Sequence, residues 1–292
     1  MSETIGQMNE LNIPGKIPKQ IREWTCHKLE CFADYIEAYT KTLKNINCCY
    51  LGLYAGCGSC ICKGTDCRIE DSELRVLRTR AKFSQYIFVV RNRQDAENLK
   101  RLTSSYSSDN IEVITGDCNN DKVARELFDL IPRSASSFAL IDPAGYRRLH
   151  WSTIELLAKH GVDWKGNKVE LLIIFPLEMA LLRNLARAEC QKSITRLYGN
   201  QQWEDIKRQK LEGKMGLEEV RHSLVELFKT GLRGLGYRYV EDFRPACLSR
   251  QAFYHLILAS DLDVGAKILK DTWGKTRYLP CELLYSTKEP VN

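Results

Sequence analysis

Five short apolar segments, rich in β-branched and aromatic residues, recur between residues 48 and 175. They are CCYLGLY (48–54), YIFVVR (86–91), IEVIT (111–115), SFALID (137–142) and VELLIIF (169–175). A strand that is apolar throughout is buried on both faces, and helical patterns separate most of these segments. The alternation predicts an α/β fold with a doubly wound, mostly parallel, Rossmann-like sheet and right-handed connections.

The pattern changes on either side of this core. Apolar residues at spacings of three to five predict an amphipathic helix over 19–44, and residues 177–235 read as helical throughout. Two later strands, 237–243 and 252–260, are expected to form an antiparallel hairpin before a closing helix at 263–275. The expected organisation is a flexible arm (1–18), an α/β domain (19–176 and 216–275), a helical insertion suited to substrate binding (177–215) and a tail (276–292).

Composition narrows the class of protein. The 292 residues, 44% of them hydrophobic, are enough to bury a core. No run approaches the roughly 18 to 20 apolar residues of a membrane span, and the N-terminus lacks a basic start followed by an apolar core. We therefore expect a cytoplasmic protein with no membrane partner. The net charge of +6 is a mild excess that suits a polyanionic partner.

In an open parallel sheet the ligand lies beyond the carboxyl ends of the strands, where strand order reverses. Three segments follow strands here, namely YAGCG (54–58), GDCN (116–119) and DPAGY (142–146), and we expect them to converge on one crevice. The phosphate-binding GxxxxGK[ST] motif and the full dinucleotide-binding GxGxxG motif are both absent. Asp117 or Asp142 alone is equally well explained as a cap or turn residue, but their joint placement favours a site.

On these segments the sequence resembles a class I S-adenosylmethionine-dependent methyltransferase, and more narrowly the three-Cys-motif partner protein family. The resemblance is carried by YLGLYAGCG (50–58), YIFVVRN (86–92), Gly116-Asp117 with Asn119, and IDPAG (141–145) followed by WSTI (151–154). It implies a sheet closed by an antiparallel strand and a glycine turn that passes under the methionine part of the cofactor. It also implies a cysteine-motif protein as a partner.

The resemblance implies roles for individual residues as well. The cofactor, S-adenosylmethionine, would be bound by Tyr54, Ala55, Gly56, Gly58, Asn92, Asp117 and Cys118. The catalytic set facing the substrate would be Asp142, Pro143 and Tyr146. Methyl transfer depends mainly on alignment of the reacting atoms, so Asp142 would orient an acceptor amine and take its proton.

The chain departs from the family pattern at two strand ends. Gly52 stands where the family has an aspartate, and the second strand ends in Val90, Arg91 and Asn92 where an acid should meet the ribose. Asn92 can still contact a ribose, although hydrogen bonds to charged groups, worth about 1.5–3 kcal/mol, are lost. The alternative to an active methyltransferase is therefore a non-catalytic nucleic-acid-binding or metal-bearing accessory protein, on a degenerate methyltransferase fold, that works with a partner enzyme.

Four cysteines, Cys57, Cys60, Cys62 and Cys67, lie in one short stretch after the first strand. Their spacing, C-x2-C-x-C-x4-C, differs from the paired hooks of zinc fingers, but four thiolates can hold zinc or an iron–sulfur cluster. A metal there would fasten the loop over the crevice. Free thiols are the alternative interpretation.

The helical insertion is rich in cations. They are Arg183, Arg187, Arg196, Lys207, Arg208 and Lys210, with Tyr198 and Trp203 between them. Cations interleaved with aromatic rings suit a surface that follows a phosphate backbone and stacks on bases, whereas a solvated helix face is the plainer interpretation. Beside a methyltransferase-like crevice, the pattern favours RNA or DNA as the substrate.

Overall fold

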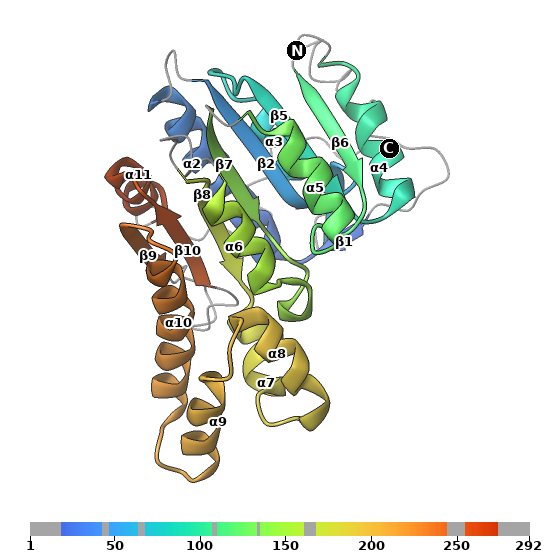
Figure 1. Ribbon diagram of the computed structural model, residues 1–292. Helices are drawn as coiled ribbons and strands as arrows, with labels where there is room; N and C mark the ends of the chain where they lie inside the picture. Colours follow the sequence, from blue (N-terminus) through green and yellow to red (C-terminus); the bar gives the residue numbers. More distant parts are fainter. Residues whose placement is uncertain are drawn as a thin grey trace.

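The main sheet confirms the predicted architecture. The computed structural model describes residues 19–42, 47–63, 68–106, 110–132, 135–160, 168–243 and 255–273. Within them, one sheet has the strand order β6-β5-β2-β7-β8-β10-β9 (Figure 1). Its strands are β2 (Cys48–Ala55), β5 (Gln85–Val90), β6 (Ile111–Thr115), β7 (Ser136–Ile141), β8 (Glu170–Phe175), β9 (Tyr239–Phe243) and β10 (His255–Ser260).

The sheet is parallel from β6 to β8, and its far side is closed by a reversed strand. β10 runs antiparallel to both β8 and β9, so the late hairpin is present as predicted. The chain builds the parallel part outward from β2, adding β5 and β6 on one side and β7 and β8 on the other. Strand order therefore reverses between β2 and β7, which is where a doubly wound sheet binds its ligand.

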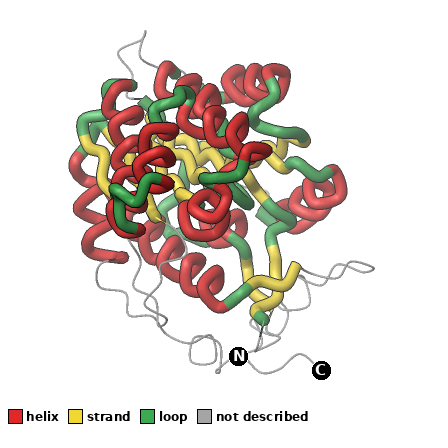
Figure 2. The backbone as a smooth tube through the Cα atoms, turned by 90° about the horizontal axis from the view of Figure 1, so that it is seen from below, coloured by secondary structure: helices red, strands yellow, loops and turns green. Residues whose placement is uncertain are grey.

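Helices cover both faces of the sheet, as Figure 2 shows with the strands in the middle. Side chains of β2 alternate between the two cores, because Cys49 and Leu51 belong to one and Cys48 and Tyr50 to the other. This burial on both faces explains why the strands are apolar throughout. One face carries α2 (Glu23–Thr42), α3 (Ser72–Leu77), α4 (Arg93–Thr103) and α11 (Asp263–Trp273), and the other α5 (Asp121–Leu130), α6 (Trp151–Lys159) and α10 (Leu217–Gly234).

The insertion between β8 and α10 is helical, as predicted. It consists of η3 (Leu177–Leu181), α7 (Leu182–Asn184), η4 (Ala188–Cys190), α8 (Gln191–Tyr198) and α9 (Trp203–Leu211). Trp151, at the start of α6, fixes it to the domain, because a Cβ atom at Gly199 would collide with the indole and one at Gly231 would lie 2.6 Å from its Cη2. Two glycines thus make the space into which the tryptophan packs.

The structure contains a second, three-stranded sheet where the sequence predicted the start of a helix and a loop. Its order is β1-β3-β4, from β1 (Lys19–Ile21), β3 (Ser59–Cys62) and β4 (Arg68–Glu70). The predicted helix from residue 19 is wrong over its first residues, and the stretch holding the cysteines is partly strand. These strands are short and form because β1 pairs in parallel with β3 from a distant part of the chain.

Some predictions fall outside the described residues. The arm (1–18), the tail (276–292) and Cys67 all lie there. Among the helices that the structure does describe, each is too short or too polar to cross a membrane.

Candidate functional site

A cleft of about 960 Å³ opens at the carboxyl ends of β2, β5, β6 and β7. It lies at the reversal of strand order, where the sequence predicted the crevice. Its lining includes most of the predicted site residues, namely Tyr54, Ala55, Gly56, Asn92, Asp117, Cys118, Asp142 and Pro143. Gly58 and Tyr146 are not part of the lining. The structure thus brings the three predicted segments together, while the role of each residue stays a prediction.

The turn after β2 requires glycine at position 58. Gly58 has a φ of +86°, and a Cβ atom there would lie 3.1 Å from Leu102 and 3.2 Å from Leu99 of α4. A side chain would therefore strain the backbone and push against the helix. Gly58 therefore packs against α4, whereas Gly56 lines the cleft.

The segment after β6 is held against the segment after β7. Asp117 Oδ1 accepts hydrogen bonds from the backbone nitrogen and Nδ2 of Asn119, at 3.0 and 2.7 Å. Asn119 Nδ2 also donates to the carbonyl oxygen of Arg148, which accepts a second bond from the Tyr54 hydroxyl at 2.9 Å. Asn119 Oδ1 accepts from Thr153 at 2.9 Å. One asparagine thus joins the walls of the cleft, and Asp117 retains an oxygen that lies 3.7 Å from Arg91 Nε.

The two strand ends that depart from the family pattern have local explanations. Asn92 caps α4, since its side-chain oxygen accepts from the backbone nitrogen of Asp95 at 3.2 Å. Val90 is buried in the core. Gly52 pairs with Phe88, and a Cβ atom at position 52 would lie 2.9 Å from the Phe88 ring. An aspartate at position 52 would require that ring to shift.

A lysine that sequence reasoning missed reaches the cleft. Lys28, on α2, donates from Nζ to Asp142 Oδ2, and its side chain is only 9% exposed. A signal for it existed, because Lys28 lies four residues from both Trp24 and Phe32 and therefore on the apolar stripe of the helix. A charged side chain on such a stripe needs an oppositely charged partner, and Asp142 is one.

A buried carboxylate beneath the glycine turn was also missed. Glu73 Oε1 accepts a hydrogen bond from the backbone nitrogen of Gly56 at 2.6 Å, and Glu73 lines the cleft. Burial, and next the nearby Asp71 carboxylate, raise the pKa of Glu73 from 4.5 to about 8. Nothing in the local sequence marks Glu73, since SELRVL reads as an ordinary helix start.

Tyr146 lies behind the cleft rather than in it. Its ring is buried, and Arg147 Nε approaches its hydroxyl at 3.4 Å while Arg147 Nη2 lies 3.1 Å from Cys190 Sγ of the insertion. His150 lies near the same contact, where burial and then the charge of Arg196 lower its pKa. The segment after β7 is therefore the point at which the insertion contacts the wall of the cleft.

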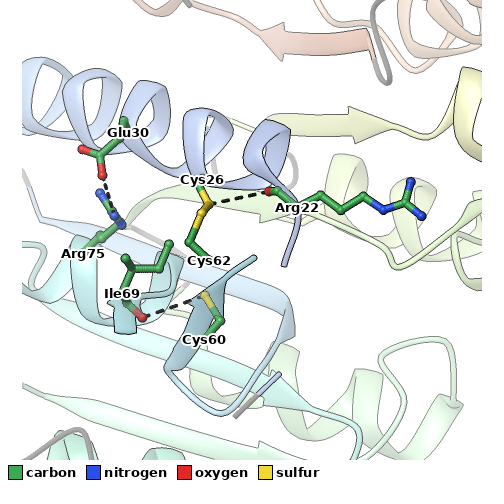
Figure 3. Close-up of a disulfide and its surroundings, with 7 residues drawn as sticks. All are labelled: Arg22, Cys26, Glu30, Cys60, Cys62, Ile69 and Arg75. Atoms are coloured by element: carbon green, nitrogen blue, oxygen red, sulfur yellow. Dashed lines mark hydrogen bonds and ion pairs between the residues drawn. A yellow bond between two sulfur atoms is a disulfide. The ribbon is translucent and has the colours of Figure 1, made fainter. Parts of the chain in front are cut away.

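The structure does not support the predicted four-cysteine metal site. Cys62 forms a disulfide with Cys26 of α2, which ties the small sheet to that helix (Figure 3). Cys57 Sγ and Cys60 Sγ instead approach backbone carbonyl oxygens, those of Ser59 at 3.2 Å and Ile69 at 3.8 Å. Within the described ranges, no group of three or more His, Cys, Asp or Glu side chains is placed to hold a metal ion.

The predicted nucleic-acid residues are on the surface, but the aromatic rings between them are not. Arg183, Arg187, Arg196 and Arg208 are exposed, and Lys207 and Lys210 are half-buried. Tyr198 and Trp203 are core residues, exposed by 2% and 0%, so they are closed to base stacking. Tyr198 ends α8 and Trp203 begins α9, and both side chains pack into the core of the domain.

Comparisons with known proteins give likeness in structure only. No family model matches the chain, and no curated protein matches it. Among solved structures, an O-methyltransferase from Bacillus cereus with S-adenosylhomocysteine is 9% identical, covers 89% of each chain and has a TM-score of 0.45. A precorrin-6y C5,15-methyltransferase from Geobacter metallireducens is 10% identical over 77% of this chain and 87% of its own, with a TM-score of 0.35. A Legionella pneumophila protein is 12% identical over 83% and 92%, with a TM-score of 0.47.

The fold class follows from the chain's own geometry. A parallel sheet that grows outward from β2 in both directions, closed by the reversed β10, is the sheet that the resemblance implied. Its cleft lies over the glycine turn and beside the Asp142-Pro143 segment. The chain is an α/β protein with a doubly wound, mostly parallel, Rossmann-like sheet.

Proposed function

We propose that this protein is an S-adenosylmethionine-dependent methyltransferase that acts on nucleic acid at an amine. The observation that carries the proposal is the cleft itself. It gathers the glycine turn after β2, Asp117 after β6 and the Asp142-Pro143 segment after β7 at the reversal of strand order. The resemblance assigns these same segments to the cofactor and the substrate.

The residues of the cleft fit the proposed cofactor. The cleft volume of about 960 Å³ suits a ligand of nucleoside size or larger. Gly56 leaves room for a ligand to approach the backbone, Asp117 offers a carboxylate, and Glu73 has a buried oxygen, Oε2, without a hydrogen-bond partner among the described residues. A buried acceptor of this kind is suited to a polar ligand group. When bound, S-adenosylmethionine supplies an electrophilic methyl group on a sulfonium centre.

Asp142 is the residue placed to act on the acceptor. One oxygen, Oδ2, accepts from Lys28, which fixes the carboxylate in the cleft wall. The other oxygen, Oδ1, has no hydrogen-bond partner among the described residues, and the side chain is 28% exposed. It can therefore accept a hydrogen bond from an entering amine, direct the nitrogen lone pair and take the proton that the methylated nitrogen releases.

The insertion supports nucleic acid as the acceptor class. Exposed Arg196 lies on α8, which packs against the segment after β7 that begins with Asp142. Arg183, Arg187 and Arg208 are exposed elsewhere on the insertion. Arginine side chains bind phosphates without reading sequence. Because Tyr198 and Trp203 are buried, the proposed surface works through charge alone. A cysteine-motif protein remains the second proposed partner, on the resemblance alone.

Transfer of a labelled methyl group tests the proposal. Purified protein is incubated with S-adenosylmethionine carrying a tritiated methyl group and with bulk RNA or DNA, and radioactivity in the nucleic acid is counted. The wild type should label one of them, whereas Asp142→Asn should not while still binding S-adenosylhomocysteine. Equal labelling by both proteins would contradict the role of Asp142.

Nucleic-acid binding is tested separately with a charge reversal. Arg187→Glu with Arg196→Glu should weaken RNA binding and lower the salt slope of log K by about 2, because two phosphate contacts are lost. Lys100→Glu with Arg101→Glu is the matched control, since both residues are exposed on α4, away from the insertion. An equal loss in the two double variants would refute a specific role for the insertion.

A second candidate, a degenerate methyltransferase fold that binds nucleic acid without catalysis, is favoured by two observations. Lys28 already occupies one oxygen of Asp142, and the ribose position after β5 carries a capping asparagine instead of an acid. This candidate predicts RNA binding without any binding of S-adenosylmethionine.

A further inference from the structure

Glu73 has an oxygen that the fold leaves without a partner. The side chain is only 3% exposed, and its Oε2 has no hydrogen-bond partner among the described residues. Its Oε1 is engaged by the backbone nitrogen of Gly56, which fixes the direction of the carboxyl group. Most buried polar atoms in proteins are hydrogen-bonded, so the unpaired, buried oxygen of a residue that lines the cleft indicates a missing donor.

The carboxylates around Glu73 favour a positively charged donor. Asp71 Oδ2 lies beside the same turn, 3.3 Å from where a Cβ atom of Gly56 would be, and Asp142 stands across the cleft. Burial is the main cause of the raised pKa of Glu73, and the Asp71 and Asp142 carboxylates raise it further. Lys28 pairs with Asp142, and among the described residues neither Asp71 nor Glu73 forms an ion pair, so a cation entering the cleft would meet two carboxyl groups without a cationic partner.

We propose that Glu73, with Asp71 beside it, binds the ammonium group of the amino-acid part of the cofactor. The inference rests on the proposed function, because it needs the cofactor's methionine part to lie over the glycine turn. It assigns to α3 the carboxylate that the chain lacks at Gly52. The structure also shows why position 52 does not carry this carboxylate, since a side chain there would contact the Phe88 ring.

Binding of a cation at Glu73 should release a proton. Free Glu73 holds its proton near neutral pH because its pKa is raised to about 8, and a bound ammonium group would favour the carboxylate. Affinity should therefore rise as pH increases towards 8. The other titratable and charged groups around Glu73 are Asp71, Asp142 with Lys28, Tyr50, Cys60 and the Glu30–Arg75 pair that joins α2 to α3. The Tyr50 and Cys60 pKa values are raised by burial, so both groups stay neutral over this range.

The test compares two ligands and three proteins by calorimetry. S-adenosylhomocysteine carries the amino-acid part, and 5′-methylthioadenosine lacks it. The proteins are the wild type, Glu73→Gln and Glu170→Gln. Glutamine keeps the acceptor for Gly56 and the size of the side chain. Glu170 is a matched control, because it is a second buried carboxyl with a raised pKa and begins β8, at the opposite end of the sheet from the cleft.

Glu73→Gln should weaken S-adenosylhomocysteine binding at least about tenfold, since a hydrogen bond to a charged group is lost, and should leave 5′-methylthioadenosine within twofold. Glu170→Gln should leave both affinities unchanged. Titrations in buffers of different ionisation enthalpy should show proton release for the wild type and none for Glu73→Gln.

Three results would overturn the assignment. If S-adenosylhomocysteine binds the wild type and Glu73→Gln equally well, Glu73 does not hold the ammonium group, and the proposed function stands. If Glu73→Gln weakens both ligands equally, the substitution has disturbed the cleft as a whole. If neither ligand binds the wild type, the proposed cofactor itself is wrong, and the inference falls with it.

Discussion

The buried carboxyl of Glu73 should make the protein less stable as pH rises. An unfolded chain loses the Glu73 proton near the ordinary pKa of 4.5, whereas the folded protein keeps it until about pH 8. Between these values the folded state binds more protons, so the free energy of unfolding falls with increasing pH. The penalty is fully present above about pH 8, and at 1.36 kcal/mol per pH unit it amounts to at most about 5 kcal/mol.

Glu73→Gln should remove this penalty, because an amide does not ionise. Urea denaturation of both proteins between pH 4 and pH 9 would show nearly equal stability at pH 4 and a growing advantage of the variant up to pH 8. Glu170→Gln serves as a control for a second buried carboxyl: its advantage should begin to grow at the same pH but level off earlier, near the Glu170 pKa of about 7. A constant difference between wild type and Glu73→Gln across the pH range would show that the Glu73 carboxyl does not keep its proton in the folded protein up to about pH 8.

Three further predictions concern the proposed role of Asp142, the packing of Trp151 against the insertion and the disulfide. Asp142→Asn should lower methyl transfer by about a hundredfold or more while S-adenosylhomocysteine binds within threefold in calorimetry; retained activity would contradict the role of Asp142. Trp151→Ala should cost about 3–5 kcal/mol in urea denaturation, because the space between Gly199 and Gly231 is left empty, and a loss below about 1 kcal/mol would argue against the anchor. Cys62→Ser should lower the free energy of unfolding by about 4 kcal/mol under non-reducing conditions, from the entropy of a loop with a sequence separation of 36. A wild type whose unfolding is unaffected by reductant would show that the disulfide is absent.

The main sheet could be predicted because its signal is local. Segments such as YIFVVR are apolar throughout, which only burial on both faces explains, and their order along the chain is enough to place the cleft. The small sheet could not be predicted in this way. β1 and β4 have three residues each, and β1 depends on a partner about forty positions away in the chain.

The charged groups of the cleft were missed for a different reason. Lys28 and Glu73 are single residues whose partners, Asp142 and Gly56, lie on other elements, so only the fold reveals them. For Trp203 the error was the opposite one, because a surface role was predicted for a residue that is buried. Its position among lysines and arginines suggested a surface for bases, but its helical spacing points it into the core.

Whether the cleft binds S-adenosylmethionine can be measured directly by calorimetric titration of the wild-type protein. We expect saturable binding at one site per chain, with proton release at pH 7. No heat of binding at millimolar S-adenosylmethionine, from a protein that unfolds cooperatively, would contradict this expectation.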